Sequence, residues 1–212
     1  MIRFWYGTTN GSGVTSRIST AYNAVEAITG QRYLEPLCDV EQVDQWRQQF
    51  RPDRVRLLLI AESHVRRGKG PGFIYDPNYY TPWWHDLLRP AFGPDISREG
   101  LRERGLWILD MSVIALSGYK KLNPDWSNRP LDSIKHQIFA ASWMHHVQQE
   151  FEEANCANVV YFDSAASMLP APVKLNATPI KFCGPSNANR YRTPEYAHGT
   201  TRFVDAVRAA GL

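Results

Sequence analysis

Cysteine is scarce in this sequence. Its 212 residues include Cys38, Cys156 and Cys183, and none of these lies within four residues of another. This spacing excludes a CxxC metal or redox motif. An odd and sparse cysteine count is typical of proteins in a reducing cytoplasm. We therefore expect a cytoplasmic protein.

A long apolar run and a strong excess of charge are also missing. No stretch approaches the roughly 18 apolar residues that a membrane span needs. Residues 1–13 lack the basic start and apolar core of a signal peptide. Lys and Arg number 24 against 21 Asp and Glu, which gives a net charge of +3. We expect no membrane association, and the weakly basic balance permits nucleic-acid binding without requiring it.

The patterns that are present indicate one α/β domain. A chain of this length forms one domain with a substantial core, so we predict a single domain over residues 1–212. Four short apolar runs are typical of buried parallel strands, and the amphipathic stretches around them indicate crossover helices. The predicted strands are 55–61, 106–109, 159–162 and 179–182, and the predicted helices are 40–50, 82–92, 131–154 and 200–210. This pattern predicts a three-layer α/β/α fold with a four-stranded parallel sheet and a long functional loop over 66–81.

Polar residues follow each predicted strand at its carboxyl end. In an open parallel sheet, ligands bind at this edge. The residues that share this position are Glu62, Ser63, His64, Asp110, Asp163 and Ser186. We therefore expect them to gather along one rim of the sheet.

Four segments, in this order, resemble motifs of the uracil-DNA glycosylase superfamily. The first is AESHV at 61–65, the second is LWIL followed by Asp110, the third is VVYFDSAASML at 159–169, and the fourth is GPSNANR at 184–190. The family's second segment ends in an Asn that reads the base, and its last reads H-P-S-P-L-S or N-P-S-G-L-S-R. The resemblance implies a uracil-DNA glycosylase-like fold. It also implies an enzyme that flips a base out of DNA and hydrolyses its N-glycosidic bond, leaving an abasic site.

The resemblance assigns catalysis to the first segment. Ser63 stands where the best-known uracil enzymes have a water-activating Asp, and Gly184 stands where they have a His. This leaves Glu62 and His64 as the nearest titratable candidates, with Ser63 beside them. The alternatives are a structural cap for Glu62 and an ordinary loop histidine for His64.

Other residues match the family's base-binding and DNA-binding positions. Tyr75 and Phe73 stand near the aromatic that stacks beneath the extruded base, although both could simply pack the loop, and Asn187 is a further base-binding candidate. The candidates for DNA contact are Ser186, Asn189, Arg190, Tyr191, Arg192, Arg66, Arg67 and Lys69. For the basic residues among them, a solvated turn is the alternative.

Asp110 is the most informative departure from the family. An Asn matches the pairing edge of uracil with one donor and one acceptor, whereas an ionised Asp offers acceptors only. The N4 amine of cytosine suits such an acceptor, and a cytosine protonated at N3 can form two hydrogen bonds with it. Asp110 therefore favours cytosine-type bases, unless it caps the following helix and never touches a base.

Three functional hypotheses follow. The first is a glycosylase that removes a modified cytosine, such as hydroxymethylcytosine or its glucosylated form in phage DNA, and so serves in antiphage defence. The second is a repair glycosylase for uracil or other deaminated bases, and the third is a catalytically inactive relative that binds DNA. We expect DNA as the partner, a monomer, and no cofactor or metal. The histidines lack metal-ligand spacing, and the iron–sulfur cluster of some branches needs four cysteines.

Overall fold

A computed structural model describes residues 16–30, 34–67, 70–76, 78, 87–116, 131–162, 169–170, 173, 177–180 and 194–212. Its central element is a sheet of four strands in which every neighbouring pair is parallel. The strands are β1 (Leu57–Ala61), β4 (Leu106–Asp110), β5 (Val159–Phe162) and β6 (Ala177–Ile180), in the order β4-β1-β5-β6.

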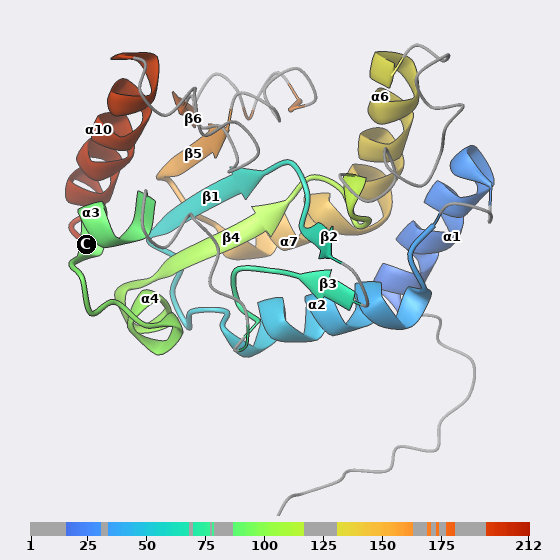
Figure 1. The fold of residues 1–212 in the computed structure, drawn as a ribbon, viewed down its shortest axis with the longest axis horizontal. Helices are drawn as coiled ribbons and strands as arrows, with labels where there is room; N and C mark the ends of the chain where they lie inside the picture. Colours follow the sequence, from blue (N-terminus) through green and yellow to red (C-terminus); the bar gives the residue numbers. More distant parts are fainter. Residues whose placement is uncertain are drawn as a thin grey trace, which may run out of the picture.

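Helices flank the sheet, and the predicted three-layer α/β/α fold with a four-stranded parallel sheet is confirmed (Figure 1). Every residue of β1, β4 and β5 is buried. Parallel strands covered on both faces consist of continuous apolar runs rather than alternating patterns, and this is why three of the strands could be predicted to within two residues. The fourth, β6, also begins within two residues of its predicted start, at Ala177, and its pairing with β5 places Phe162 opposite Ile180.

Several helices overlap the predicted stretches. They are α2 (Leu37–Gln49), α3 (Arg89–Phe92), α10 (Pro194–Ala209) and the continuous run of α6 (Leu131–Ser142), η4 (Trp143–Val147) and α7 (Gln148–Ala154). However, α10 begins six residues and α2 three residues before the predicted start. The run over 131–154 contains one turn of π-helix, η4, which the sequence pattern did not predict. Residues 82–86 of the predicted helix 82–92 lie outside the described residues.

Two helices and a hairpin were not predicted. α1 (Arg17–Thr29) begins at Ser16, whose side chain accepts a hydrogen bond from the Ser19 backbone N–H. α4 (Arg98–Arg104) ends at Gly105, whose left-handed φ of 89° suits a glycine. The long loop predicted over 66–81 contains regular structure at its start, because β2 (Val65–Arg67) and β3 (Gly70–Gly72) pair as an antiparallel hairpin.

The core has two parts. The larger surrounds the sheet, and the smaller joins α1, α2 and α6 to the segment that follows β4. Ile18, Ala21, Tyr22 and Val25 supply the contribution of α1 to this smaller cluster. Figure 1 shows α1 and α6 beyond the arrowheads of β1 and β4, so these helices lie at the carboxyl end of the sheet. Among the described residues, no helix has the length and apolar character that crossing a bilayer requires.

Candidate functional site at the carboxyl end of the sheet

The ends of β1 and β4 lie side by side. Ala61 is the register partner of Asp110, and the contact continues beyond the strands: the backbone N–H of Ser112 donates to the Glu62 carbonyl at 3.0 Å. The predicted residues Glu62, Ser63 and His64 therefore adjoin Asp110, as the strand-end argument implies. Asp163 and Ser186, predicted for the same rim, lie outside the described residues.

His64 forms a buried pair with Glu35. The imidazole side chain is fully buried, and its Nε2 lies 2.9 Å from Glu35 Oε1 and 3.0 Å from Oε2. The carboxylate is itself fixed, because its Oε1 accepts the backbone N–H of Ala115 at 2.6 Å. The Glu35 carbonyl also accepts the hydroxyl of Tyr22 at 2.8 Å. Glu35 thus joins the segment before α2 to the segments after β1 and β4.

The other ring nitrogen of His64, Nδ1, is buried and unpaired among the described residues. In a neutral imidazole whose Nε2–H donates to Glu35, Nδ1 carries a lone pair and can accept a proton. This arrangement of an imidazole oriented by a carboxylate is one that general bases use. Sequence reasoning missed Glu35, because nothing in its local sequence distinguishes it from an ordinary charged linker residue.

Glu62 and Ser63 have different surroundings from His64. The side chain of Glu62 is 31% exposed and forms an ion pair with Lys135 of α6. Ser63 Oγ accepts the backbone N–H of Leu116 at 3.3 Å. Glu62 is therefore a charged group at the edge of the site, and Ser63 holds the segment that follows β4.

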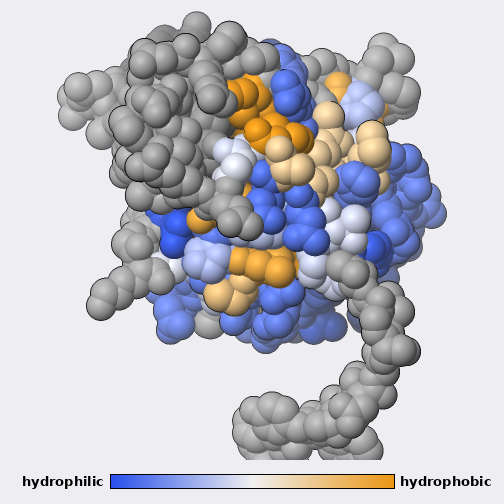
Figure 2. Space-filling model, turned by 90° about the vertical axis from the view of Figure 1, so that its right-hand side faces the viewer, coloured by the Kyte–Doolittle hydropathy of each residue, from blue (hydrophilic) through white to orange (hydrophobic). Residues whose placement is uncertain are grey.

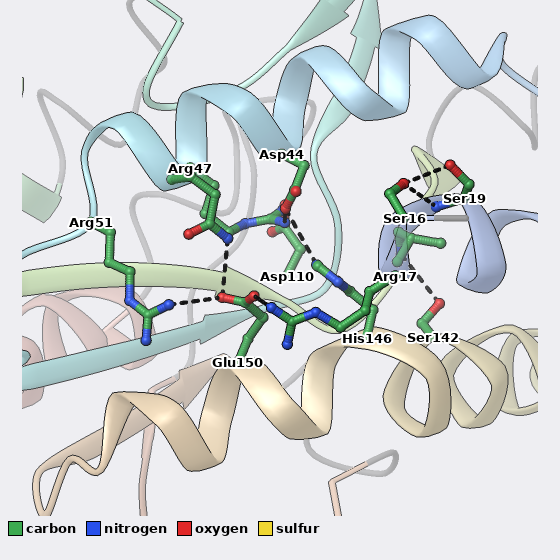
Figure 3. Close-up of polar contacts among 12 residues, drawn as sticks. Ser16, Arg17, Ser19, Asp44, Arg47, Arg51, Asp110, Ser142, His146 and Glu150 are labelled. Carbon is green, nitrogen blue, oxygen red and sulfur yellow. Dashed lines mark hydrogen bonds and ion pairs between the residues drawn. The ribbon is translucent and has the colours of Figure 1, made fainter. Parts of the chain in front are cut away.

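Asp110 has a partner that neither sequence interpretation foresaw. Its Oδ2 lies 3.2 Å from Arg47 NH2 of α2, and both side chains are at most 3% exposed (Figure 3). Arg47 also reaches Asp44 at 3.2 Å, and Asp44 Oδ1 lies 3.3 Å from Nε2 of His146. Burial raises the pKa of the Asp110 carboxyl, while the charges of Arg47 and His64 and hydrogen bonds from both residues oppose that rise. Asp110 thus ends a chain of polar contacts that runs through Arg47 and Asp44 to His146.

The aromatic candidates pack into the core. Tyr75 is fully buried, its ring stacks on Phe50 with centroids 5.5 Å apart, and Phe73 meets it edge-on at 5.4 Å. The Tyr75 hydroxyl accepts the backbone N–H of Ile108 at 3.1 Å, and burial raises the pKa of this hydroxyl. These contacts favour packing over base stacking for both rings.

Two of the predicted DNA-contact residues lie in the described part of the chain. Arg66 and Arg67 belong to β2, and Arg66 NH2 lies 4.0 Å from Asp39 Oδ2. The remaining DNA-contact candidates lie outside the described residues: Lys69, Ser186, Asn189, Arg190, Tyr191 and Arg192. So do the base-binding candidate Asn187 and Gly184, which stands where the family has a His.

A second polar cluster beside the site is structural. Buried Glu150 of α7 accepts a hydrogen bond from Gln48 Nε2 at 3.1 Å, and Arg17 and Arg51 approach it to 3.7 and 3.6 Å (Figure 3). These contacts join α1, α2 and α7. Among the described residues, no three His, Cys, Asp or Glu side chains are grouped so that they could hold a metal ion.

Comparison with family models, with curated proteins and with solved structures finds no match for this chain. Because a fold class hosts many activities, a functional argument must come from the site. Here that site is His64 with Glu35, next to Asp110 with Arg47.

Asp44 should make stability depend on pH. Burial acts to raise the pKa of Asp44, but His146 and Arg47 outweigh it and hold the pKa below its ordinary value. Such a carboxyl stabilises the fold above its unfolded pKa of about 3.9, and this contribution is lost as the pH falls through the lower folded value. We expect Asp44→Asn to reduce the free energy of unfolding at pH 6, and the difference from wild type to shrink toward pH 3. Urea denaturation of both proteins measures this, and a difference that is constant with pH contradicts it.

Proposed function

We propose that this protein is a DNA glycosylase that removes a cytosine-type base, such as hydroxymethylcytosine or its glucosylated form in phage DNA, and leaves an abasic site. The observation that carries the proposal is the buried His64–Glu35 pair at the carboxyl end of β1, beside Asp110 at the end of β4. These two strand ends hold the first two of the four segments that resemble the uracil-DNA glycosylase superfamily. Antiphage defence is the role that such a substrate suggests.

In the proposed reaction, water is the nucleophile. Nδ1 of His64 takes a proton from the water as its oxygen attacks C1′ of the extruded nucleotide, and the electron pair of the breaking C1′–N bond goes to the departing base. The sugar passes through an oxocarbenium-like transition state, as in glycoside hydrolysis generally. Glu35 orients the imidazole and stabilises its protonated form, since its carboxylate faces Nε2 at 2.9 Å.

The net charge of the side chains around His64 and Asp110 favours a cytosine-type base as the substrate. Glu35 and Asp110 are buried carboxylates and Asp44 is a partly exposed one, whereas Arg47 is the buried arginine that reaches Asp44 and Asp110. Even with one imidazole protonated, the group keeps an excess of negative charge, which favours a cationic sugar and a base protonated at N3. Uracil leaves as an anion, which the same charges oppose.

One observation favours a second candidate, DNA binding without catalysis. The side chain of His64 is fully buried among the described residues, so water and substrate must gain access to Nδ1 before any reaction. A protein that binds DNA but never lets water reach His64 would have the same His64–Glu35 pair.

The deciding experiment counts abasic sites in matched duplexes that carry uracil, cytosine, hydroxymethylcytosine or its glucoside. We expect excision of a cytosine-type base, with a preference over uracil of about 5- to 150-fold, the selectivity that one unpaired buried polar group produces. Excision of uracil alone would assign the protein to repair of deaminated bases. Binding of every duplex without abasic sites would favour the non-catalytic candidate.

A further inference from the structure

His146 lies at the one π-helical turn in the helical run from Leu131 to Ala154. The backbone N–H of Gln148 donates to the carbonyl of Trp143, five residues earlier, which widens the turn. One inserted residue rotates the positions beyond it by about 100° around the helix axis. Here His146 and Val147 are both buried, although they are neighbours in the sequence.

His146 is buried without the hydrogen bonds that an imidazole normally forms. The imidazole is 3% exposed, and none of the described residues makes an aligned hydrogen bond to either ring nitrogen. Its Nε2 does lie at ion-pair distance from Asp44 Oδ1, 3.3 Å away. An apolar side chain would avoid the cost of burying two such nitrogens, so the contact with Asp44 is the feature that needs an explanation.

Asp44 leads from His146 to the site. Arg47 contacts Asp44 through NH1 and Asp110 through NH2, both at 3.2 Å, and thus divides one positive charge between two carboxylates. Besides Arg47, the titratable groups that act on Asp110 are His64 and Tyr75. Arg17 of α1, Arg51 after α2 and Glu150 of α7 form the neighbouring cluster, and Figure 3 shows both arginines turned toward Glu150. His146 is therefore a second partner for Asp44, in addition to Arg47.

We infer that His146 is a positioning residue: by contacting Asp44, it leaves Arg47 free to neutralise Asp110 at the site. The inference rests on the proposed function for its effect on excision, but its electrostatic part stands independently. Without His146, Asp44 depends on Arg47 more strongly, and Asp110 loses part of its counter-charge. Without the Asp44 charge, Arg47 serves Asp110 alone. The two changes therefore shift the titration of Asp110 in opposite directions.

The test follows the Asp110 carboxyl carbon by ¹³C NMR during a pH titration, with its signal assigned from Asp110→Asn. We expect Asp110 to titrate at higher pH in His146→Phe and at lower pH in Asp44→Asn than in wild type. His146→Gln, which keeps a donor for Asp44, should fall between wild type and His146→Phe. His145→Phe is the matched control, because His145 is the adjacent imidazole, is only partly buried, and should leave the titration unchanged.

Should His146→Phe fail to fold, His146→Met provides the same measurement with a more adaptable apolar side chain. An Asp110 titration that is the same in wild type and in the folded His146 variant overturns the inference. So does a shift of the same sign in the His146 variant and Asp44→Asn.

Excision gives the second measurement. Coupling through such a network typically changes a rate about 2- to 30-fold, so we expect kcat to fall by that factor in His146→Phe with KM for the oligonucleotide unchanged. If the wild-type protein excises no base, the proposed function fails, while the NMR titration still decides the role of His146.

Discussion

Replacing Arg47 with methionine is expected to lower the free energy of unfolding by about 3–5 kcal/mol, the cost of breaking a buried ion pair by removing one partner. The guanidinium is 3% exposed and faces both Asp110 and Asp44. Methionine fills a similar volume beside the Phe73 ring, over which Arg47 lies at 5.2 Å. The loss therefore comes from Asp110, which is left without a cation, and from Asp44, which keeps only His146 as a partner. Urea denaturation at pH 7 measures it.

Two further variants show whether charge is the cause. Adding Asp110→Asn to Arg47→Met removes the buried carboxylate that has lost its cation, and it should recover part of the lost stability. Arg102→Met is the surface control, because Arg102 is 48% exposed and pairs with a fully exposed Asp53 at 3.7 Å. Such pairs contribute at most about 1 kcal/mol. If Arg47→Met and Arg102→Met lose similar amounts of stability, the buried ion pair does not stabilise the fold.

The sheet was predictable because each buried strand is marked by the residues of that strand alone. Leu57–Ala61 and Val159–Phe162 are buried on both faces, so each appears as an apolar run without alternation. α1 also carries a local signal that the prediction did not use. Ser16 caps a stretch in which Ile18, Ala21, Tyr22 and Val25 recur at helical spacing.

The site was predictable only in part. The strand-end rule places His64 and Asp110 at the same rim, since both follow recognisable strands. Their partners could not be found this way, because Glu35 is 29 residues from His64 and Arg47 is 63 residues from Asp110. Such pairs form when α2 and the segment before it pack beside the ends of β1 and β4. The periodic patterns of a single sequence do not indicate which distant side chains that packing brings together.

The burial of Tyr75 illustrates a further limit. Its place in the sequence suggested stacking against a base, yet its hydroxyl accepts the Ile108 N–H and its ring stacks on Phe50. Sequence spacing shows how far a side chain lies from a motif along the chain. It does not show which face of a loop packs inward, and here that choice depends on contacts with β4 and the end of α2.

Replacing Glu35 with glutamine is expected to reduce kcat for base excision by about 10²- to 10⁴-fold, with a much smaller effect on DNA affinity, because a positioned acid or base typically contributes this much. The change preserves size and one acceptor oxygen, which can keep the Ala115 N–H bond of 2.6 Å. The new amide N–H₂ then faces Nε2 of His64. To accept that hydrogen bond, Nε2 must lose its proton, and the neutral imidazole changes to the tautomer with its proton on Nδ1.

That tautomer cannot take a proton from water through Nδ1, which is why the loss falls on kcat. The tautomer itself can be observed without any substrate: ¹⁵N NMR should show the proton on Nε2 in wild type and on Nδ1 in Glu35→Gln. Single-turnover excision of the preferred base measures the rate, and unfolding by urea confirms that the variant is folded. Glu62→Gln separates the two carboxyl candidates, because Glu62 lies at the exposed edge with Lys135. If Glu62→Gln shows the large loss and Glu35→Gln does not, catalysis depends on the motif carboxylate and the role given to Glu35 is wrong.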